Sequence, residues 1–128
     1  MNRRLEILAT NYGRNAGWFV ELNDRRVAIL TDPEFFDMFW ESYHVTPLTT
    51  DATESQRILT DRKWWLENRL VFRNRKFDEI ADLAFPAGDV FTESGRIIMR
   101  GLYLVIDPPN LWERIRLFLR RNVLRREE

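Results

Sequence analysis

Basic side chains cluster in the stretch 62–77, whose sequence is RKWWLENRLVFRNRKF. If this stretch contains a β-strand, successive side chains point to opposite faces of the sheet. The alternation places a set of basic residues on one face, and we call this set the arginine ladder: Arg69, Arg73, Arg75 and the adjacent Lys76. Guanidinium groups bind phosphate oxygens with charge-assisted hydrogen bonds, so the ladder predicts a site for nucleic acid or for another anion.

Two properties of the sequence disfavour nucleic acid as the partner. The chain has 20 basic and 20 acidic residues and a pI near 6.6, whereas domains that bind nucleic acid are usually strongly basic. The ladder face also lacks aromatic residues on which bases could stack. Basic and acidic residues alternate in bands along the chain, so the arginines are expected to pair with acidic residues on neighbouring strands. Nucleic-acid binding is therefore an alternative and not the favoured function.

Candidate catalytic groups are few. The chain has one histidine, His44, and no cysteine, which excludes a cysteine nucleophile and thiolate metal sites. Glycine-rich phosphate loops and the serine motif of the nucleophile elbow are absent. An acidic run follows a helix-start signal and is interpreted as solvated acids on a helical turn: Asp32, Glu34, Asp37 and Glu41. The sequence therefore predicts no catalytic residue, metal site or cofactor. An enzyme that uses carboxylates and His44 is a second alternative.

Residues 110–126 predict an amphipathic C-terminal helix that begins at a capping asparagine. At about 100° per residue, its large apolar side chains share one arc of roughly 140°. We call this set the apolar arc: Leu111, Trp112, Ile115, Phe118, Leu119 and Val123. The apolar arc is expected to pack on the sheet, because a sheet face must be covered. That expectation disfavours a peripheral membrane role, and no apolar run is long enough for a membrane-spanning helix.

A second apolar strip is predicted on the opposite side of this helix. Leu117 and Leu124 lie seven residues apart, next to arginines. If the apolar arc covers the sheet, the strip stays available to another molecule. We therefore expect a surface for a protein partner or a second copy of the chain at Leu117, Leu124, Arg120 and Arg121.

The elements that would position these groups are mostly strands. The clearest is a hairpin of residues 18–22 and 26–30 around the polar turn 23–25. Further strands are predicted at 38–46, 64–72, 77–85 and 96–106, with a helical turn at 78–84 as the alternative to the third of these. Turns are predicted at 74–76 and 86–89, a loop or short helix at 49–61, and a strand or helical turn at 5–9.

Together these patterns predict a single domain over residues 1–128, of mainly β (α+β) class. Residues 1–106 are expected to form an antiparallel β-barrel or sandwich of about six or seven strands, with the amphipathic helix 110–126 packed on it. The start of the chain has no apolar run typical of a secretory signal, so a cytoplasmic protein is expected. The favoured function is a small non-enzymatic interaction module that can associate with itself or with a protein partner.

Overall fold

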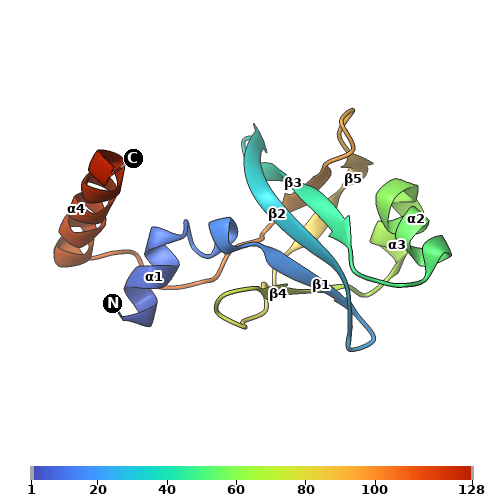
Figure 1. Ribbon diagram of the computed structural model, residues 1–128, viewed down its shortest axis with the longest axis horizontal. Helices are drawn as coiled ribbons and strands as arrows, with labels where there is room; N and C mark the ends of the chain where they lie inside the picture. The colour runs from blue at the N-terminus through green and yellow to red at the C-terminus, as the bar shows by residue number, and fades with distance from the viewer. Residues whose placement is uncertain (1, 128) are drawn as a thin grey trace.

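The structure is a computed structural model that describes residues 2–127, with side-chain surroundings through residue 120. Across this range, six strands form one antiparallel sheet in the order β4-β1-β2-β3-β6-β5, which curls like half of a barrel (Figure 1). The predicted α+β fold with an antiparallel sheet and a C-terminal helix is confirmed, but the chain is not mainly β, because helices take up about as much of it as strands do. The sheet is open, however, with β4 and β5 as its outer strands. The elements are α1 (Arg3–Ala9), the 3-10 helix η1 (Arg14–Ala16), β1 (Trp18–Leu22), β2 (Arg25–Asp37), β3 (Trp40–Pro47), α2 (Ala52–Thr60), α3 (Arg62–Glu67), β4 (Val71–Asn74), β5 (Phe85–Phe91), β6 (Ile97–Arg100) and α4 (Leu111–Glu127).

The predicted hairpin is confirmed as β1 and β2. Asn23 and Asp24 connect the strands and both have positive φ, 51° and 63°. This is the conformation that matches the right-handed twist of two paired strands, and asparagine and aspartate tolerate it well.

The predicted helical start at Asp32 is wrong, because β2 continues through it to Asp37. The pairing of β2 with β3 shifts register between Thr31 and Glu34, and Asp32 has a positive φ of 55°. Pro33 lies within this irregularity, where a missing backbone N–H costs no regular ladder bond. The acidic run therefore follows an extended, irregular strand rather than a helical turn.

The strand predicted at 64–72 is also wrong in its first half, which forms α3. Asp61 accepts a hydrogen bond from the backbone N–H of Lys63 at 2.9 Å and so caps this helix. Trp64 and Trp65 are both buried in the core. Two consecutive residues of a strand would point to opposite faces, whereas the short helix turns both rings inward. Trp65 donates its indole N–H to the carbonyl oxygen of Ile58 at 2.8 Å, which ties α3 to α2.

The second half of the sheet differs from the prediction in its boundaries. The strand expected at 77–85 is reduced to a single bridge between Ile80 and Arg73. The turn expected at 86–89 lies inside β5, and the long strand expected at 96–106 ends at Arg100. Gly101 ends it with a φ of 81°, at a point where a Cβ atom would overlap the carbonyl oxygen of Leu83. Only glycine fits such a position without strain.

The helix α4 forms as predicted, but it does not pack on the sheet. Asn110 and Glu113 cap each other, with each side chain accepting the other residue's backbone N–H at 2.9 and 3.0 Å. Figure 1 shows α4 beyond α1, at the opposite end of the molecule from α2 and α3. The expected packing fails because other residues fill the core: Trp64 and Trp65 of α3, and Leu102 and Leu104 of the segment after β6.

Two ion pairs hold α4 against α1. The Arg4 Nε atom lies 2.6 Å from the Glu113 carboxylate, and the Arg120 Nη1 atom lies 3.3 Å from that of Glu6. Arg4 also donates to the carbonyl oxygens of Asp107 and Pro108 at 2.7 and 2.9 Å. Arg4 thereby fixes both the start of α4 and the segment that leads to it.

Within the described part of the chain, none of the helices combines the length and apolar character needed to cross a bilayer.

Candidate functional site

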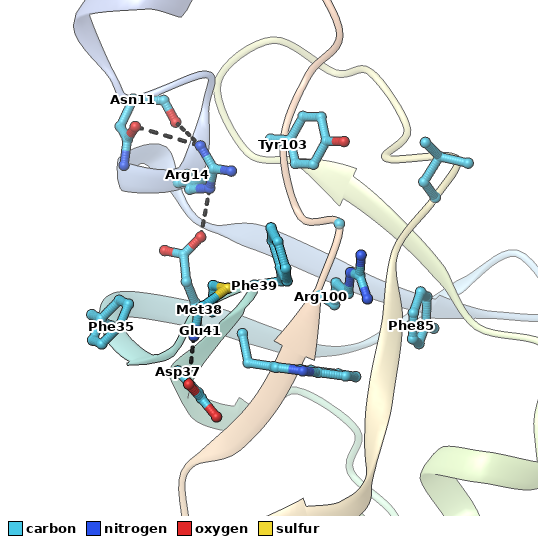
Figure 2. A pocket seen from close by; sticks show the side chains of 13 residues that line it. Asn11, Arg14, Phe35, Asp37, Met38, Phe39, Glu41, Phe85, Arg100 and Tyr103 are labelled. Atoms are coloured by element: carbon cyan, nitrogen blue, oxygen red, sulfur yellow. Dashed lines mark hydrogen bonds and ion pairs between the residues drawn. The ribbon is translucent and has the colours of Figure 1, made fainter.

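A groove of about 800 Å³ opens between the β2–β3 turn, the η1 loop and the segment that follows β6 (Figure 2). Its lining combines aromatic and aliphatic side chains with four charged ones, Arg14, Asp37, Glu41 and Arg100. We call it the aromatic groove and define it by six apolar or aromatic side chains: Phe35, Met38, Phe39, Trp40, Phe85 and Tyr103.

The β2–β3 turn exposes one side of the groove to solvent. The Asp37 carboxylate accepts the backbone N–H of Met38 at 2.7 Å and so fixes the turn. Phe35 is 80% exposed and Met38 is 75% exposed. Because water disfavours contact with apolar surface of this size, neighbouring exposed side chains of this kind usually mark a binding surface.

The floor of the groove combines aromatic rings with a cation. The rings of Trp40 and Phe85 meet edge to face with centroids 5.6 Å apart. The guanidinium group of Arg100 lies over Phe39, 5.0 Å from the ring centroid, and 6.0 Å from that of Trp40. Among the residues with described side chains, no carboxylate forms an ion pair with Arg100. The groove thus offers a cation beside apolar rings.

A second arginine defines the opposite wall. The Arg14 Nε atom lies 2.6 Å from the Glu41 carboxylate, and its guanidinium group lies over the Tyr103 ring at 5.0 Å. Figure 2 shows Arg14 pointing at Glu41 across the space between the η1 loop and β3. Burial, and secondarily the Glu41 charge, raise the pKa of the nearby Tyr43 hydroxyl. Tyr43 is therefore protonated at neutral pH, so it does not supply a base to this wall.

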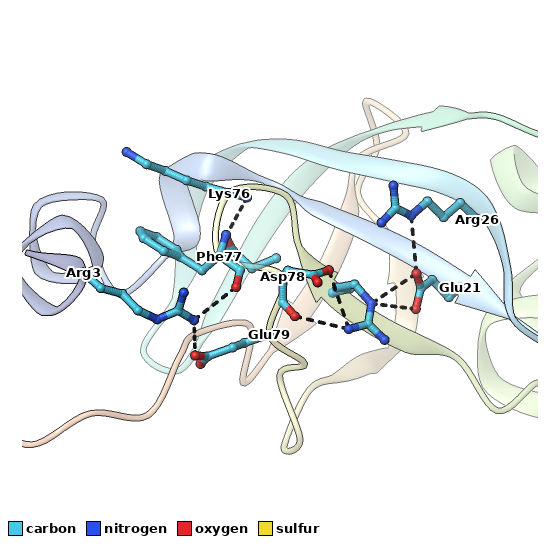
Figure 3. Close-up of polar contacts among 9 residues, drawn as sticks. Arg3, Glu21, Arg26, Lys76, Phe77, Asp78 and Glu79 are labelled. Atoms are coloured by element: carbon cyan, nitrogen blue, oxygen red, sulfur yellow. Dashed lines mark hydrogen bonds and ion pairs between the residues drawn. The ribbon is translucent and has the colours of Figure 1, made fainter.

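The arginine ladder is distributed over three settings. Arg73 alone lies on β4; Arg69 precedes the strand, and Arg75 and Lys76 follow it. The Arg73 Nε atom is 3.1 Å from the Glu21 carboxylate, which also pairs with Arg26 at 3.5 Å (Figure 3).

Two of the other three ladder cations also have neighbours. Lys76 donates to the Glu6 carboxylate at 2.7 Å. The Arg75 guanidinium lies 5.9 Å from the centroid of the Phe19 ring. Arg69 is exposed. Acidic side chains therefore neutralise part of the ladder, as the banding of charges along the sequence suggests.

The predicted acid–base groups are separated from one another. His44 is exposed, and its Nδ1 atom lies 3.4 Å from the hydroxyl of Thr46. Asp32 and Glu34 pair with Arg96 at 3.1 and 3.5 Å. Within the part of the chain that the structure describes, no three histidine or acidic side chains are grouped to hold a metal ion.

The two faces of α4 are reversed relative to the expectation. Leu117 is half-buried and, together with Leu8 of α1 and Arg120, lines a hollow of about 390 Å³. The side chains of Arg121 and Leu124 lie outside the described residues. Leu111 and Trp112 of the apolar arc are 69% and 73% exposed. The apolar arc therefore faces away from the body of the molecule, by which we mean residues 2–110, and Leu117 on the other side of the helix faces α1.

Sequence reasoning missed the aromatic groove, although one signal was present. A strand with one buried face cannot bury four large side chains as close in sequence as Phe35, Phe36, Phe39 and Trp40.

No family model, curated protein or solved structure matches this chain.

Proposed function

We propose that this domain is a non-enzymatic interaction module that binds a segment of a protein partner in the aromatic groove. The observation that carries the proposal is the exposure of Phe35, Met38 and Phe39 around one groove. Aromatic residues, methionine and arginine are enriched at the centres of protein interfaces, and aromatic and arginine anchors often dominate their energy. The groove contains all three types. From the sequence-based expectation, we place this activity in the cytoplasm.

The groove chemistry defines the partner segment. Apolar side chains would cover Phe39, Trp40 and Phe85, which form the floor. A carboxylate of the same segment would pair with Arg100, whose charge lies beside the rings. We therefore expect a short segment with aromatic or aliphatic anchors and at least one acidic residue.

Selection from a random peptide library tests this proposal, followed by titration of the selected peptides by calorimetry. Selected peptides should combine apolar anchors with an acidic residue. Phe39→Ala and Arg100→Ala should each weaken binding roughly tenfold or more, as expected for interface anchors. Phe36→Ala is the matched control, because Phe36 is also exposed but does not line the groove.

Sedimentation equilibrium tests whether the partner is a second copy of the chain. A mass that rises with concentration in the wild type, and less in Phe39→Ala, would identify self-association through the groove. The proposal is wrong if no peptide is selected and the mass stays monomeric at all concentrations. It is also wrong if Phe39→Ala and Phe36→Ala affect binding equally.

A second candidate is single-stranded nucleic acid bound in the same groove. The supporting observation is the stacking of Arg100 on Phe39 and of Arg14 on Tyr103. Proteins that bind single strands combine aromatic platforms with arginines in this way. Asp37 and Glu41 in the same groove oppose a polyanion, so the protein segment is favoured. Binding of an oligonucleotide that weakens with salt and depends on Arg100 would favour nucleic acid instead.

A further inference from the structure

The apolar arc of α4 is exposed although it is the most apolar side of the helix. Its described members are all exposed: Leu111, Trp112, Ile115, Phe118 and Leu119. An amphipathic helix on a protein normally turns this side toward the body. Here the body is in contact with the other side of the helix.

Ion pairs fix this orientation. Glu113 and Arg120 reach toward α1, where they pair with Arg4 and Glu6 at 2.6 and 3.3 Å. Leu117 lies on the same side and is half-buried against α1. Because a helix turns by about 100° per residue, Glu113, Leu117 and Arg120 lie on the side of α4 roughly opposite the apolar arc. The contacts with α1 therefore present the apolar arc to the surroundings.

Arginines flank the apolar arc on both sides. Arg114 and Arg116 are exposed, and helical spacing places one beyond each border of the arc. The C-terminal segment 111–128 has six arginines and three glutamates, whereas residues 1–110 have 14 basic and 17 acidic residues. The charge of the chain is thus polarised, with the positive end at the exposed helix.

We propose that α4 binds an anionic lipid bilayer, lying in the plane of the membrane surface with the apolar arc inserted. Apolar side chains enter the boundary between headgroups and acyl chains, while arginines at the borders reach the lipid phosphates. Tryptophan is favoured at this depth because its ring is apolar and its N–H is polar. The acidic body is repelled by the same surface, so it stays on the water side.

The expectation against a membrane role depended on the arc packing on the sheet, and this packing does not occur. A second copy is a less suitable occupant. Two α4 helices paired through their arcs would bring the flanking arginines of both chains together, and like charges disfavour such a contact.

Co-sedimentation of the full chain with lipid vesicles tests the proposal. Vesicles of phosphatidylcholine mixed with phosphatidylglycerol should bind the protein, and vesicles of phosphatidylcholine alone should bind it much more weakly. Binding should fall as salt is raised, because surface charges are screened. The tryptophan emission of the protein should shift to the blue on binding, since the ring of Trp112, which is 73% exposed, leaves water.

Variants separate the apolar and the charged contributions. Ile115→Glu should weaken binding by about tenfold or more, because it places a charge in the inserted face. Arg114→Gln combined with Arg116→Gln should weaken it roughly 20–30-fold, at about 1 kcal/mol per cation near an anionic surface. Leu66→Glu is the matched control, since Leu66 on α3 is 42% exposed and Ile115 is 41% exposed. Unchanged circular dichroism and melting temperature will show that each variant is folded.

Three outcomes would overturn the proposal. One is no binding to the anionic vesicles at low salt. Another is vesicle binding that Ile115→Glu leaves intact but Phe39→Ala abolishes, which would place lipid at the aromatic groove. The third is concentration-dependent dimerisation that Ile115→Glu abolishes without any vesicle binding, which would make the arc an interface between copies. None of these three results decides whether the aromatic groove binds protein segments, which peptide titration measures separately.

Discussion

The side chain of Asn74 donates from Nδ2 to the carbonyl oxygen of Gly13 at 2.8 Å, and so joins the end of β4 to the loop before η1. The Oδ1 atom of Asn74 accepts the backbone N–H groups of Lys76 and Phe77, each at 3.0 Å. Asn74 is 1% exposed. One buried amide therefore holds two segments that the sequence separates by 61 positions.

Asn74→Ala should destabilise the domain by about 2–3 kcal/mol, because it leaves buried polar groups without partners. Urea unfolding followed by tryptophan fluorescence will measure the free energy of unfolding. Asn15→Ala is the control, because Asn15 is exposed in the same loop region and should change stability by less than about 0.5 kcal/mol. Equal effects of the two substitutions would show that the Asn74 amide does not hold the loop.

Three glycine-to-alanine variants separate backbone strain from steric overlap. Gly88 has no neighbour within 4 Å of the Cβ position and no positive φ, so Gly88→Ala should be close to neutral. Gly95 has a φ of 81° in open space, and Gly95→Ala should cost about 1 kcal/mol. Gly101 has the same φ, and its added Cβ would overlap the Leu83 carbonyl oxygen. Gly101→Ala should therefore cost about 2–4 kcal/mol. Thermal unfolding of the three variants will test this order, and a Gly101→Ala protein as stable as Gly95→Ala would contradict it.

Arg4 should control the ionisation of Glu113. Its hydrogen bond, followed by that from the Asn110 backbone, lowers the pKa of the Glu113 carboxyl below the ordinary 4.5. A carboxyl with a lowered pKa in the folded state stabilises the fold above its unfolded pKa. This contribution to the free energy of unfolding is lost as the pH falls below 4.5 and through the lowered pKa that Glu113 has in the folded state. The Arg4–Glu113 interaction, which joins α1 to the start of α4, should therefore weaken at acidic pH.

Arg4→Gln should raise the pKa of Glu113 toward its ordinary value, which carbon-13 NMR titration of the carboxyl groups can measure. Glu54 is the internal control, because Arg25 lowers its pKa at the other end of the molecule. A Glu113 titration unchanged by Arg4→Gln would remove Arg4 as the anchor of α4.

Glu21 should mask the cation of Arg73. In Glu21→Gln both Arg73 and Arg26 lose the Glu21 carboxylate, and Arg73 keeps only the longer pairing with Asp78 at 3.7 Å. The surface over β4, β1 and β2 should therefore bind anions better. The logarithmic salt slope for a single-stranded oligonucleotide should steepen by about one, the value for one added phosphate contact. Glu93→Gln changes the net charge equally in the β5–β6 turn and should leave the slope unchanged. Equal slopes in all three proteins would show that the ladder does not bind phosphate even when unmasked.

The features predicted correctly from the sequence are those with local causes. The turn at Asn23 and Asp24 depends on two residues and their flanking strands, and the start of α4 depends on the cap at Asn110. The α3 helix was missed because local alternation favours a strand there. Its helical form depends on burying both Trp64 and Trp65, which is a tertiary requirement.

The candidate sites depend on contacts between distant segments, which a single sequence does not reveal. Phe39 and Arg100 meet in the aromatic groove only because β3 pairs with β6. The orientation of α4 depends on Arg4, which is 109 positions from its partner Glu113. The apolar pattern of α4 was predicted correctly, but the pattern does not say which side meets the body.

The outer strands of the open sheet limit how this domain can aggregate. An exposed strand edge is a template for adding another chain by backbone hydrogen bonds. On the β4 side, residues Glu79 and Ala81 already exchange backbone hydrogen bonds with Asn74 and Phe72. On the β5 side, Pro86 removes a backbone donor. Growth of a continuous intermolecular sheet is therefore disfavoured at both edges of the sheet. The chain can thus expose aromatic side chains elsewhere without forming fibrils through its strand edges.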